Sequence, residues 1–216
     1  MTLLEKIYQG KIIAIVRGVP CALMLDTARA LLKGGIHMME VTFNQASEEG
    51  IRETADSIRL LAKELPDEIL LGAGTVMTPE QVDLAKECGA RYIISPNVDV
   101  DVIRRTKELG MVSIPGAFTP SEIAVAYKAG ADIVKLFPTG LMGTAYIKAI
   151  MGPLSHIPVS AVGGVDDKNI AAFFKAGVCS VGIGGSLVDR KAIAAGNFEA
   201  ITQTAQKLTD AISELQ

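Results

Sequence analysis

The sequence predicts an α/β fold, a (β/α)8 or TIM barrel formed by residues 1–216 as a single domain. Two observations support this prediction. Short β-branched runs alternate with longer helix-compatible segments along the whole chain, which is typical of parallel β-α units. No linker, low-complexity tract or block of like charges interrupts the alternation, and 216 residues are an ordinary length for one barrel.

Each predicted strand is a short apolar run that follows a predicted helix. Residues 2–10 precede the first strand and predict a short N-terminal helix. Eight strands predict a closed barrel, whereas a doubly wound open sheet would accommodate six or seven. Five of the predicted helices end in a glycine, at Gly34, Gly89, Gly110, Gly130 and Gly177. The predicted strands cover residues 12–17, 38–43, 70–76, 92–96, 111–116, 133–138, 158–163 and 180–184.

Two helices carry the signature of an N-terminal capping box. Thr78-Pro79-Glu80-Gln81 and Thr119-Pro120-Ser121-Glu122 each combine a threonine cap, a proline at the first helical position, and Gln or Glu three residues after the cap. We expect a helix to begin at each of these sites.

The composition excludes several classes of protein. A net charge of −3 gives no basic surface for nucleic acid, and no apolar run predicts a signal peptide or a membrane span. Cys21, Cys88 and Cys179 are odd in number, far apart and in no metal-binding spacing, which predicts reduced thiols and a cytoplasmic protein. Because His37 and His156 are the only histidines, no metal site built by the protein is expected.

In a barrel of this kind the chemistry lies at the carboxyl ends of the strands. The sixth predicted strand carries Lys135 in an apolar run, where burial would lower the pKa of the amine. In the second strand the two-residue period places Glu40, Thr42 and Asn44 on one face, towards the barrel interior. Lys135 and Glu40 could form a structural ion pair, but their place at the active end of the fold favours catalysis.

A buried lysine with a carboxylate nearby suits Schiff-base chemistry. An unprotonated amine at Lys135 can attack a ketone, and Glu40 can transfer protons while water leaves and a carbon–carbon bond breaks. The iminium then supplies the electron sink that a metal would otherwise provide, so no cofactor is expected.

Glycines at the ends of the last two strands predict a phosphate site. Gly163-Gly164 lies at the end of the seventh strand and Gly184-Gly185-Ser186 at the end of the eighth, where phosphate-binding barrels place backbone N–H groups. The alternative is that these glycines only permit tight turns. Ser186 could add a hydroxyl donor, and Arg17 could bring positive charge.

Other residues at the strand ends are expected to line the same pocket. Gly72-Ala73-Gly74-Thr75 lacks the length and the acidic partner of a dinucleotide loop, so we expect close approach of the substrate, with Thr75 as a donor. Pro96 and Phe137 are expected to form apolar walls. No functional role is expected for His37 or His156.

Seven motifs occur in an order that resembles one enzyme family. They are Glu-Val-Thr (40–42), Gly-Ala-Gly-Thr-Val (72–76), Ile-Ser-Pro-Asn (94–97), Ile-Pro-Gly (114–116), Thr-Pro-Ser-Glu (119–122), Val-Lys-Leu-Phe-Pro (134–138) and Gly-Gly-Val (163–165). Over essentially its whole length the chain resembles the class I aldolases that act on 2-keto-3-deoxy-6-phosphogluconate (KDPG) and 4-hydroxy-2-oxoglutarate (KHG). The resemblance implies a homotrimer of barrels. It also implies cleavage of KDPG to pyruvate and glyceraldehyde 3-phosphate, or of KHG to pyruvate and glyoxylate.

The same resemblance implies roles for individual residues. Lys135 matches the Schiff-base lysine, Glu40 the general acid and base, and Thr75 the threonine near the keto-acid carboxylate. The remaining matches are pocket walls (Pro96 and Phe137) and phosphate contacts (Gly163, Gly164, Ser186 and, as a further candidate, Arg17).

Two positions depart from the KDPG pattern. Asn44 stands where many members carry an arginine, and Val162 stands where the motif usually reads Thr-Gly-Gly. Both choices resemble the branch that acts on the epimer, 2-keto-3-deoxy-6-phosphogalactonate. Loss of a hydroxyl from the pocket wall changes which C4 configuration is bound, so the epimer stays open.

Two other functions compete with the aldolase hypothesis. A sugar-phosphate isomerase or epimerase on the same barrel would need metal ligands or a further acid/base pair at the strand ends. A non-catalytic phosphosugar-binding barrel would leave Lys135 and Glu40 without purpose. The aldolase hypothesis is favoured, and it predicts activity that survives a chelator.

Overall fold

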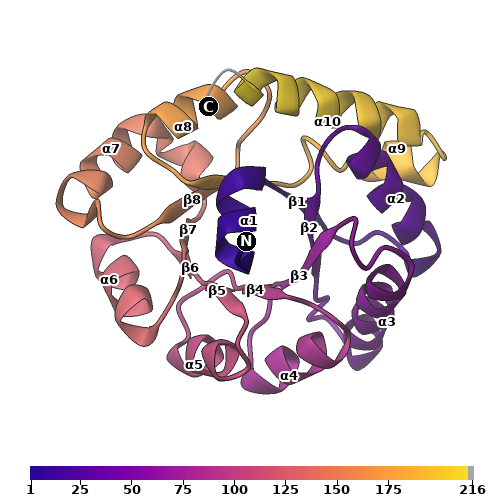
Figure 1. Ribbon diagram of the computed structural model, residues 1–216, viewed down its shortest axis with the longest axis horizontal. Coiled ribbons are helices and arrows are strands. Elements are labelled where there is room, and N and C mark those ends of the chain that lie inside the picture. Colours follow the sequence, from indigo (N-terminus) through magenta and orange to yellow (C-terminus); the bar gives the residue numbers. More distant parts are fainter. Residues whose placement is uncertain (214–216) are drawn as a thin grey trace.

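Nine parallel strands form one sheet that curves into a ring in the computed structural model, which describes residues 1–213 (Figure 1). The last three residues of the predicted domain lie outside this range. The order of the strands in the sheet is β5-β4-β3-β2-β1-β9-β8-β7-β6. The strands are β1 (Ile12–Val16), β2 (Met38–Thr42), β3 (Leu70–Gly74), β4 (Tyr92–Ile94), β5 (Val112–Ile114), β6 (Gly116–Ala117), β7 (Val134–Leu136), β8 (Val159–Val162) and β9 (Ser180–Ile183).

The ring closes through β5 and β6, which are two halves of the strand predicted at 111–116. Only Pro115 separates them, and proline has no N–H to donate to a neighbouring strand. β5 pairs with β4 and β6 pairs with β7, while the N–H of Lys135 donates to the carbonyl of Pro115 at 2.9 Å. The prediction of an eight-stranded barrel is confirmed, with one strand divided, and the alternative of an open sheet is wrong.

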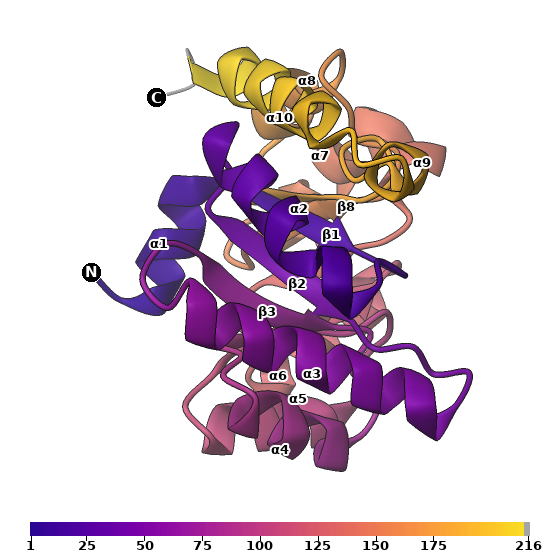
Figure 2. The ribbon, with the colours of Figure 1, turned by 90° about the vertical axis from the view of Figure 1, so that its right-hand side faces the viewer.

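Helices surround the ring, and one helix lies across its end. α1 (Leu3–Gly10) confirms the predicted N-terminal helix and covers the end at which the strands begin (Figures 1 and 2). No helix in residues 1–213 is long and apolar enough to cross a membrane. The outer elements are α2 (Cys21–Lys33), α3 (Glu48–Glu64), α4 (Pro79–Glu87), α5 (Val100–Glu108), α6 (Pro120–Ala129), the 3-10 helix η1 (Thr139–Leu141), α7 (Gly143–Leu154), α8 (Ile170–Lys175), α9 (Arg190–Ala194) and α10 (Phe198–Ser213).

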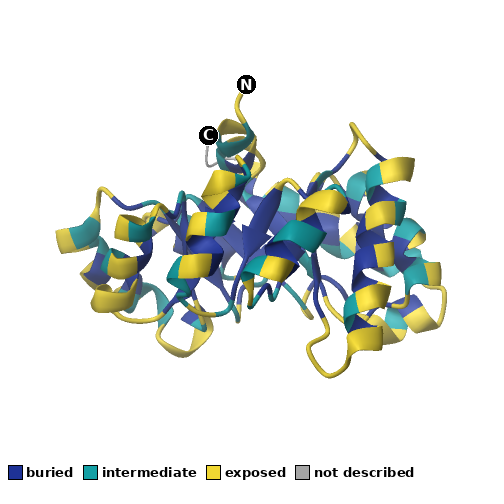
Figure 3. Cartoon of the chain, turned by 90° about the horizontal axis from the view of Figure 1, so that it is seen from below, coloured by how far each residue is buried: buried dark blue, intermediate teal, exposed yellow. Residues whose placement is uncertain are grey.

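Two apolar clusters stabilise this arrangement. The larger cluster lies between the strands and the outer helices, whose outward faces are exposed (Figure 3). The smaller one fills the interior at the N-terminal end, where Ile7 of α1 packs with inward-facing Ile13, Met38 and Tyr92. Burial of this apolar surface closes the barrel at the N-terminal ends of its strands. The open end, at the carboxyl ends of the strands, is where the chemistry of such barrels takes place.

Local backbone chemistry explains where the elements end. β3 was predicted to reach residue 76 but ends at Gly74, because Thr75 has a φ of 55° in the left-handed region. Gly130, in contrast, is the left-handed C-cap expected of α6, with a φ of 109°.

The two predicted capping boxes have different outcomes. Thr119 and Glu122 form the full reciprocal box at the start of α6. At the start of α4 the side chain of Thr78 accepts from the N–H of Gln81, but the Gln81 side chain accepts from the N–H of Met77 instead of returning to the cap. The capping box of α4 is therefore only half formed, and the Gln81 side chain bonds to the backbone of Met77 instead.

Candidate active site

A cavity of about 510 Å³ opens at the carboxyl ends of the strands. It brings together ten of the thirteen predicted site residues from segments far apart in the sequence. Glu40 and Thr75 lie next to the residues of this cavity, whereas Asn44 lies elsewhere. The ten residues are Arg17, Pro96, Lys135, Phe137, Val162, Gly163, Gly164, Gly184, Gly185 and Ser186.

Lys135 lies in the middle of β7 and is 6% exposed. The small residues Gly116 of β6 and Ser160 of β8 flank it in the sheet, and its Nζ lies 5.0 Å from the centre of the Phe137 ring. Burial lowers the pKa of the amine below its ordinary value of 10.5; the carboxylate of Glu40 opposes this shift and Arg17 adds to it. Lys135 is therefore deprotonated more easily than a surface lysine.

Glu40 lies in β2, opposite Ile15 of β1 and Gly72 of β3, and is 2% exposed. Within residues 1–213 its Oε2 is the one buried side-chain oxygen or nitrogen with no hydrogen-bond partner. Burial raises the pKa of the carboxyl group, while Lys135 and Arg17 pull that pKa back down. Each of the two groups therefore opposes the shift that burial causes in the pKa of the other, and within residues 1–213 no ion pair joins them directly.

The glycines of β3 make room for this carboxylate. A Cβ atom on Gly74 would lie 2.0 Å from Oε2 of Glu40, and one on Gly72 would lie 2.1 Å from the ring of Tyr92. Tyr92 is fully buried beneath the site, and its hydroxyl donates to the carbonyl of Met39 at 2.7 Å. Our sequence analysis missed Tyr92, although two glycines at alternate positions of a strand signal a large neighbour on the inner face.

Thr75 joins the site through Arg17. The Nη2 atom of Arg17 donates to the hydroxyl oxygen of Thr75 at 3.0 Å. Since a hydroxyl can accept one bond and still donate another, Thr75 keeps a proton to offer, and Arg17 keeps further N–H groups. The pair presents a positive charge and a hydroxyl donor beside the cavity, which suits a carboxylate.

Hydrogen bonds to its carbonyl groups hold the glycine loop that follows β8. The carbonyls of Gly163, Gly164 and Val165 accept in turn from Gly140 N–H at 2.7 Å, Asn169 Nδ2 at 2.8 Å and Ser186 Oγ at 2.8 Å. Gly163 and Gly164 both have positive φ, at 90° and 77°, which this turn requires.

The N–H groups of this loop and of the loop at 184–186 remain available to a ligand. Among the described residues no protein acceptor bonds the N–H groups of Gly164, Val165, Gly185 or Ser186. Ser186 was predicted to offer its hydroxyl to a phosphate, but that hydroxyl donates to Val165, so its backbone N–H is the donor left to it. Free amides in two adjacent loops can hold an anion.

Asn44 departs from its predicted place. It lines a separate cavity of about 250 Å³ with Val16, Thr42 and Glu53, and its Oδ1 accepts from the N–H of Ala46 at 3.1 Å. The two-residue alternation that put Asn44 beside Glu40 no longer applies, because β2 ends at Thr42 and the chain turns there. Asn44 is not brought together with Lys135.

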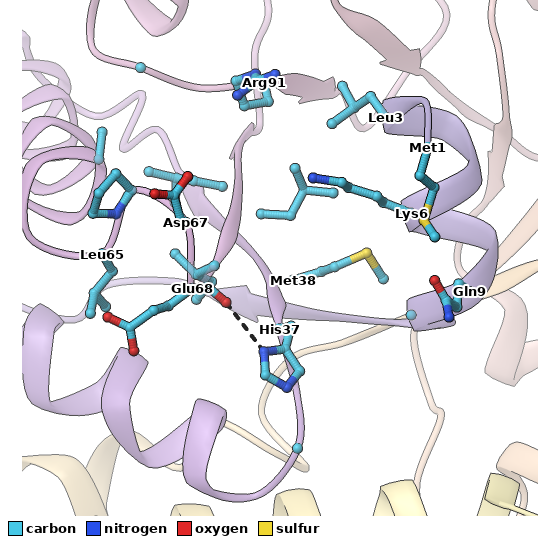
Figure 4. A pocket seen from close by; sticks show the side chains of 18 residues that line it. Met1, Leu3, Lys6, Gln9, His37, Met38, Leu65, Asp67, Glu68 and Arg91 are labelled. Carbon is cyan, nitrogen blue, oxygen red and sulfur yellow. Dashed lines mark hydrogen bonds between the residues drawn. The ribbon is translucent and has the colours of Figure 1, made fainter.

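A larger cavity, of about 840 Å³, lies at the opposite end of the barrel beside α1 (Figure 4). Its lysine, Lys6, is exposed, and His37 contacts the carbonyl of Glu68 at 3.2 Å. Within residues 1–213 no group of three or more His, Cys, Asp or Glu side chains could hold a metal ion. The buried lysine and carboxylate occur only at the other end of the barrel, among the described residues.

The chain is similar in sequence to known aldolases. The chain is 38% identical over 177 residues to 2-dehydro-3-deoxy-6-phosphogalactonate aldolase of Escherichia coli K12, which covers 82% of this chain and 83% of that protein. It is 32% identical over 212 residues to 2-dehydro-3-deoxy-phosphogluconate aldolase of Haemophilus influenzae, with 97% and 96% covered.

A solved structure gives the same picture. KDPG aldolase from Legionella pneumophila, with pyruvate captured as a covalent carbinolamine intermediate, superposes with a TM-score of 0.86 at 29% identity and covers 96% of this chain and 98% of its own. Residues 3–204 match the sequence family described as KDPG and KHG aldolase. By fold and by sequence, the chain belongs to the KDPG and KHG aldolase family.

Proposed function

We propose that this protein is a class I aldolase in which Lys135 forms a Schiff base with a 2-keto acid and Glu40 transfers the protons. The observation that carries the proposal is the pair of buried groups at the open end of the barrel, each with a pKa shifted by burial towards its neutral form. A neutral amine attacks a carbonyl, and a neutral carboxylic acid can donate a proton.

The proposed reaction balances protons through Glu40. Nζ of Lys135 attacks the C2 carbonyl, and the resulting hydroxyl leaves as water after Glu40 protonates it, which gives an iminium and a carboxylate. The carboxylate then removes the proton of the C4 hydroxyl, whose electrons form the C=O bond of the departing aldehyde. The C3–C4 bond breaks, and its electrons move to the nitrogen to give an enamine. Glu40 returns the proton to C3, and water hydrolyses the iminium to pyruvate and the free amine, while the proton released in this step returns to the Glu40 carboxylate.

The two ends of the substrate are proposed to bind at opposite sides of Lys135. Arg17 and the hydroxyl of Thr75 suit the keto-acid carboxylate, because they combine a charge with a free donor. The unpaired N–H groups of the loops at 163–165 and 184–186 suit the phosphate. Pro96 and Phe137 line the space between as apolar walls.

The proposed substrates are KDPG, cleaved to pyruvate and glyceraldehyde 3-phosphate, and KHG, cleaved to pyruvate and glyoxylate. The galactonate epimer is a second candidate, because Val162 presents an apolar side chain to the cavity and a relative named for that epimer is 38% identical. Initial rates with KDPG, its epimer and KHG distinguish them. Val162→Thr should move the ratio of kcat/KM values towards KDPG, since it adds a hydroxyl where the C4 configuration is read.

Borohydride trapping tests the chemistry. Incubation with pyruvate, chelator and borohydride should leave one reduced pyruvyl adduct, on the peptide that contains Lys135. Lys135→Met should abolish the adduct, whereas Lys148→Met, at an exposed lysine of α7, should not change it. An adduct on another lysine, or none at all, contradicts the proposal. The favoured functions would then be a sugar-phosphate isomerase or a phosphosugar-binding barrel. Unchanged phosphosugar binding by Lys135→Ala would favour the binding barrel.

We also propose that the protein assembles as a homotrimer. Large exposed apolar side chains recur in the segment from residue 118 to 142, and exposed apolar side chains of this size are often covered at an interface. Sedimentation velocity should give the mass of three chains, and a monomer would contradict the proposal. The cytoplasmic location stays a prediction. The exposed side chains are Phe118, Val125, Tyr127, Phe137, Leu141 and Met142, of which Phe137 lines the candidate site.

A further inference from the structure

The backbone of Thr75 is held in an unusual conformation. Its φ of 55° lies in the left-handed region, which is rare for a residue other than glycine and rarer still for a β-branched one. Such a conformation persists only where its surroundings impose it, and it is found at functional sites. Thr75 directly follows β3, and its hydroxyl is the group that Arg17 contacts.

Two glutamines contact the backbone on either side of Val76, beginning at Thr75. Nε2 of Gln45 donates to the carbonyl of Thr75 at 2.7 Å, and also to Oε1 of Gln81 at 3.0 Å. Nε2 of Gln81 donates back to Oε1 of Gln45 at 2.8 Å, so the amides form a reciprocal pair. Oε1 of Gln81 also accepts from the N–H of Met77 at 2.8 Å. The pair therefore binds the backbone on both sides of Val76, at the carbonyl of Thr75 and the N–H of Met77.

The side chain of Gln81 does not form the hydrogen bond that its position in the sequence favours. Its position in Thr-Pro-Glu-Gln favours a return bond to the N-cap of α4, yet its side chain turns away to Gln45 and Met77. Gln81 is only 8% exposed, so its amide must find partners inside the protein. Those partners are the residues that shape the loop after β3.

We propose that Gln45 and Gln81 are positioning residues that hold the hydroxyl of Thr75 against Arg17, ready for the carboxylate of the keto-acid substrate. Neither glutamine lines the cavity, so both act through Thr75. The proposal rests on the proposed function, because it needs a substrate carboxylate at Thr75. It predicts that loss of the pair weakens substrate binding and leaves the chemistry at Lys135 intact.

The first test is Gln45→Glu, which keeps the size of the side chain but replaces the donor with a carboxylate facing the carbonyl of Thr75. A lost hydrogen bond to a charged group weakens binding roughly 10- to 100-fold, so we expect KM for the phosphorylated keto acid to rise by that factor. The kcat value should change little, because the lost contact stabilises the bound substrate and the transition state equally. Gln9→Glu makes the same change in α1, at the far end of the barrel, and should leave both constants unaltered.

A double-mutant cycle with Thr75→Gly tests whether the effect passes through Thr75. Glycine adopts positive φ without strain and carries no hydroxyl, so Thr75→Gly should itself raise KM. In that background Gln45→Glu should raise KM less than about 2-fold further, because coupled residues are not additive. An equal rise in both backgrounds would overturn the proposal, and so would no rise in the native background.

Borohydride trapping separates this proposal from the proposed function. At saturating pyruvate, Gln45→Glu and Gln81→Glu should both still give the adduct at Lys135. If the native protein gives no adduct, the Schiff-base function itself fails. If the native protein gives the adduct and the glutamine variants keep native KM values, only the positioning role fails.

Discussion

Replacing Glu40 with glutamine removes a charge from the barrel interior with almost no change of shape. Glu40 is 2% exposed, and its Oε2 has no partner among the described residues. An unpaired buried polar group costs about 1–3 kcal/mol, and a charged one costs more. The glutamine amide stays unpaired but neutral, so we expect the free energy of unfolding to rise by about 1–2 kcal/mol at neutral pH. For a chain of this size each kcal/mol raises Tm by roughly 2–4 °C.

The expected gain depends on pH. Burial raises the pKa of Glu40 above its ordinary value of 4.5, so the folded protein binds this proton more tightly than the unfolded chain does. The stabilising contribution of this proton to the free energy of unfolding is therefore fully present below about pH 4.5. It is lost as the pH rises through the pKa of Glu40 in the folded state. Glu40→Gln should match the native protein in acid and exceed it at higher pH.

Urea denaturation at acid, neutral and mildly alkaline pH measures this difference. Lys135→Met is the control of opposite charge: burial lowers the pKa of the amine, so its stabilising effect should instead grow as the pH falls. In the same preparations Glu40→Gln should lower kcat roughly 100- to 10,000-fold, the usual contribution of a general acid or base. A variant less stable than the native protein at neutral pH, or a gap independent of pH, would refute the reasoning.

Three further changes test neighbouring parts of the site. Arg17→Gln should raise the pKa of Lys135, so the pH of half-maximal pyruvate trapping should move upwards, and a downward shift would contradict the electrostatics. Tyr92→Phe removes the bond to the β2 backbone, so unfolding should cost about 1 kcal/mol less, or roughly 2–4 °C in Tm. In Gly140→Ala a Cβ would lie 2.8 Å from Cα of Gly164. Its KM for the phosphorylated substrate should rise roughly 10-fold or more while pyruvate trapping is unchanged, and a normal KM would show that this loop does not hold the phosphate.

Periodic signals allowed most of the fold to be predicted from the sequence. Alternation of apolar runs with helix-compatible segments does not depend on tertiary contacts, and neither does the Gly130 that ends α6. The ends of the strands were harder to predict from the sequence, because they depend on the backbone angles of single residues. The positive φ of Thr75 ends β3 early, and the division of the fifth predicted strand at Pro115 follows from a missing N–H.

Within the site, residues inside regular strands could be placed from the sequence and residues beyond them could not. Lys135 and Glu40 lie within β7 and β2, so alternation gave their inward direction correctly. Asn44 lies two residues past the end of β2, where alternation has no meaning, and it faces another cavity. The pairing of Gln45 with Gln81 joins residues 36 positions apart, and no local pattern predicts such a contact.

Three unfavourable features of this barrel lie at its carboxyl end. They are the unpaired oxygen of Glu40, the buried amine of Lys135 and the left-handed backbone of Thr75. At the other end Ile7 of α1 is fully buried against the inward side chains of the strands, without a polar group in that cluster that lacks a partner. Because the apolar end supplies stability without taking part in the chemistry, the carboxyl end can bury an amine and a carboxyl group, and this burial shifts the pKa of each towards the neutral form that Schiff-base chemistry uses.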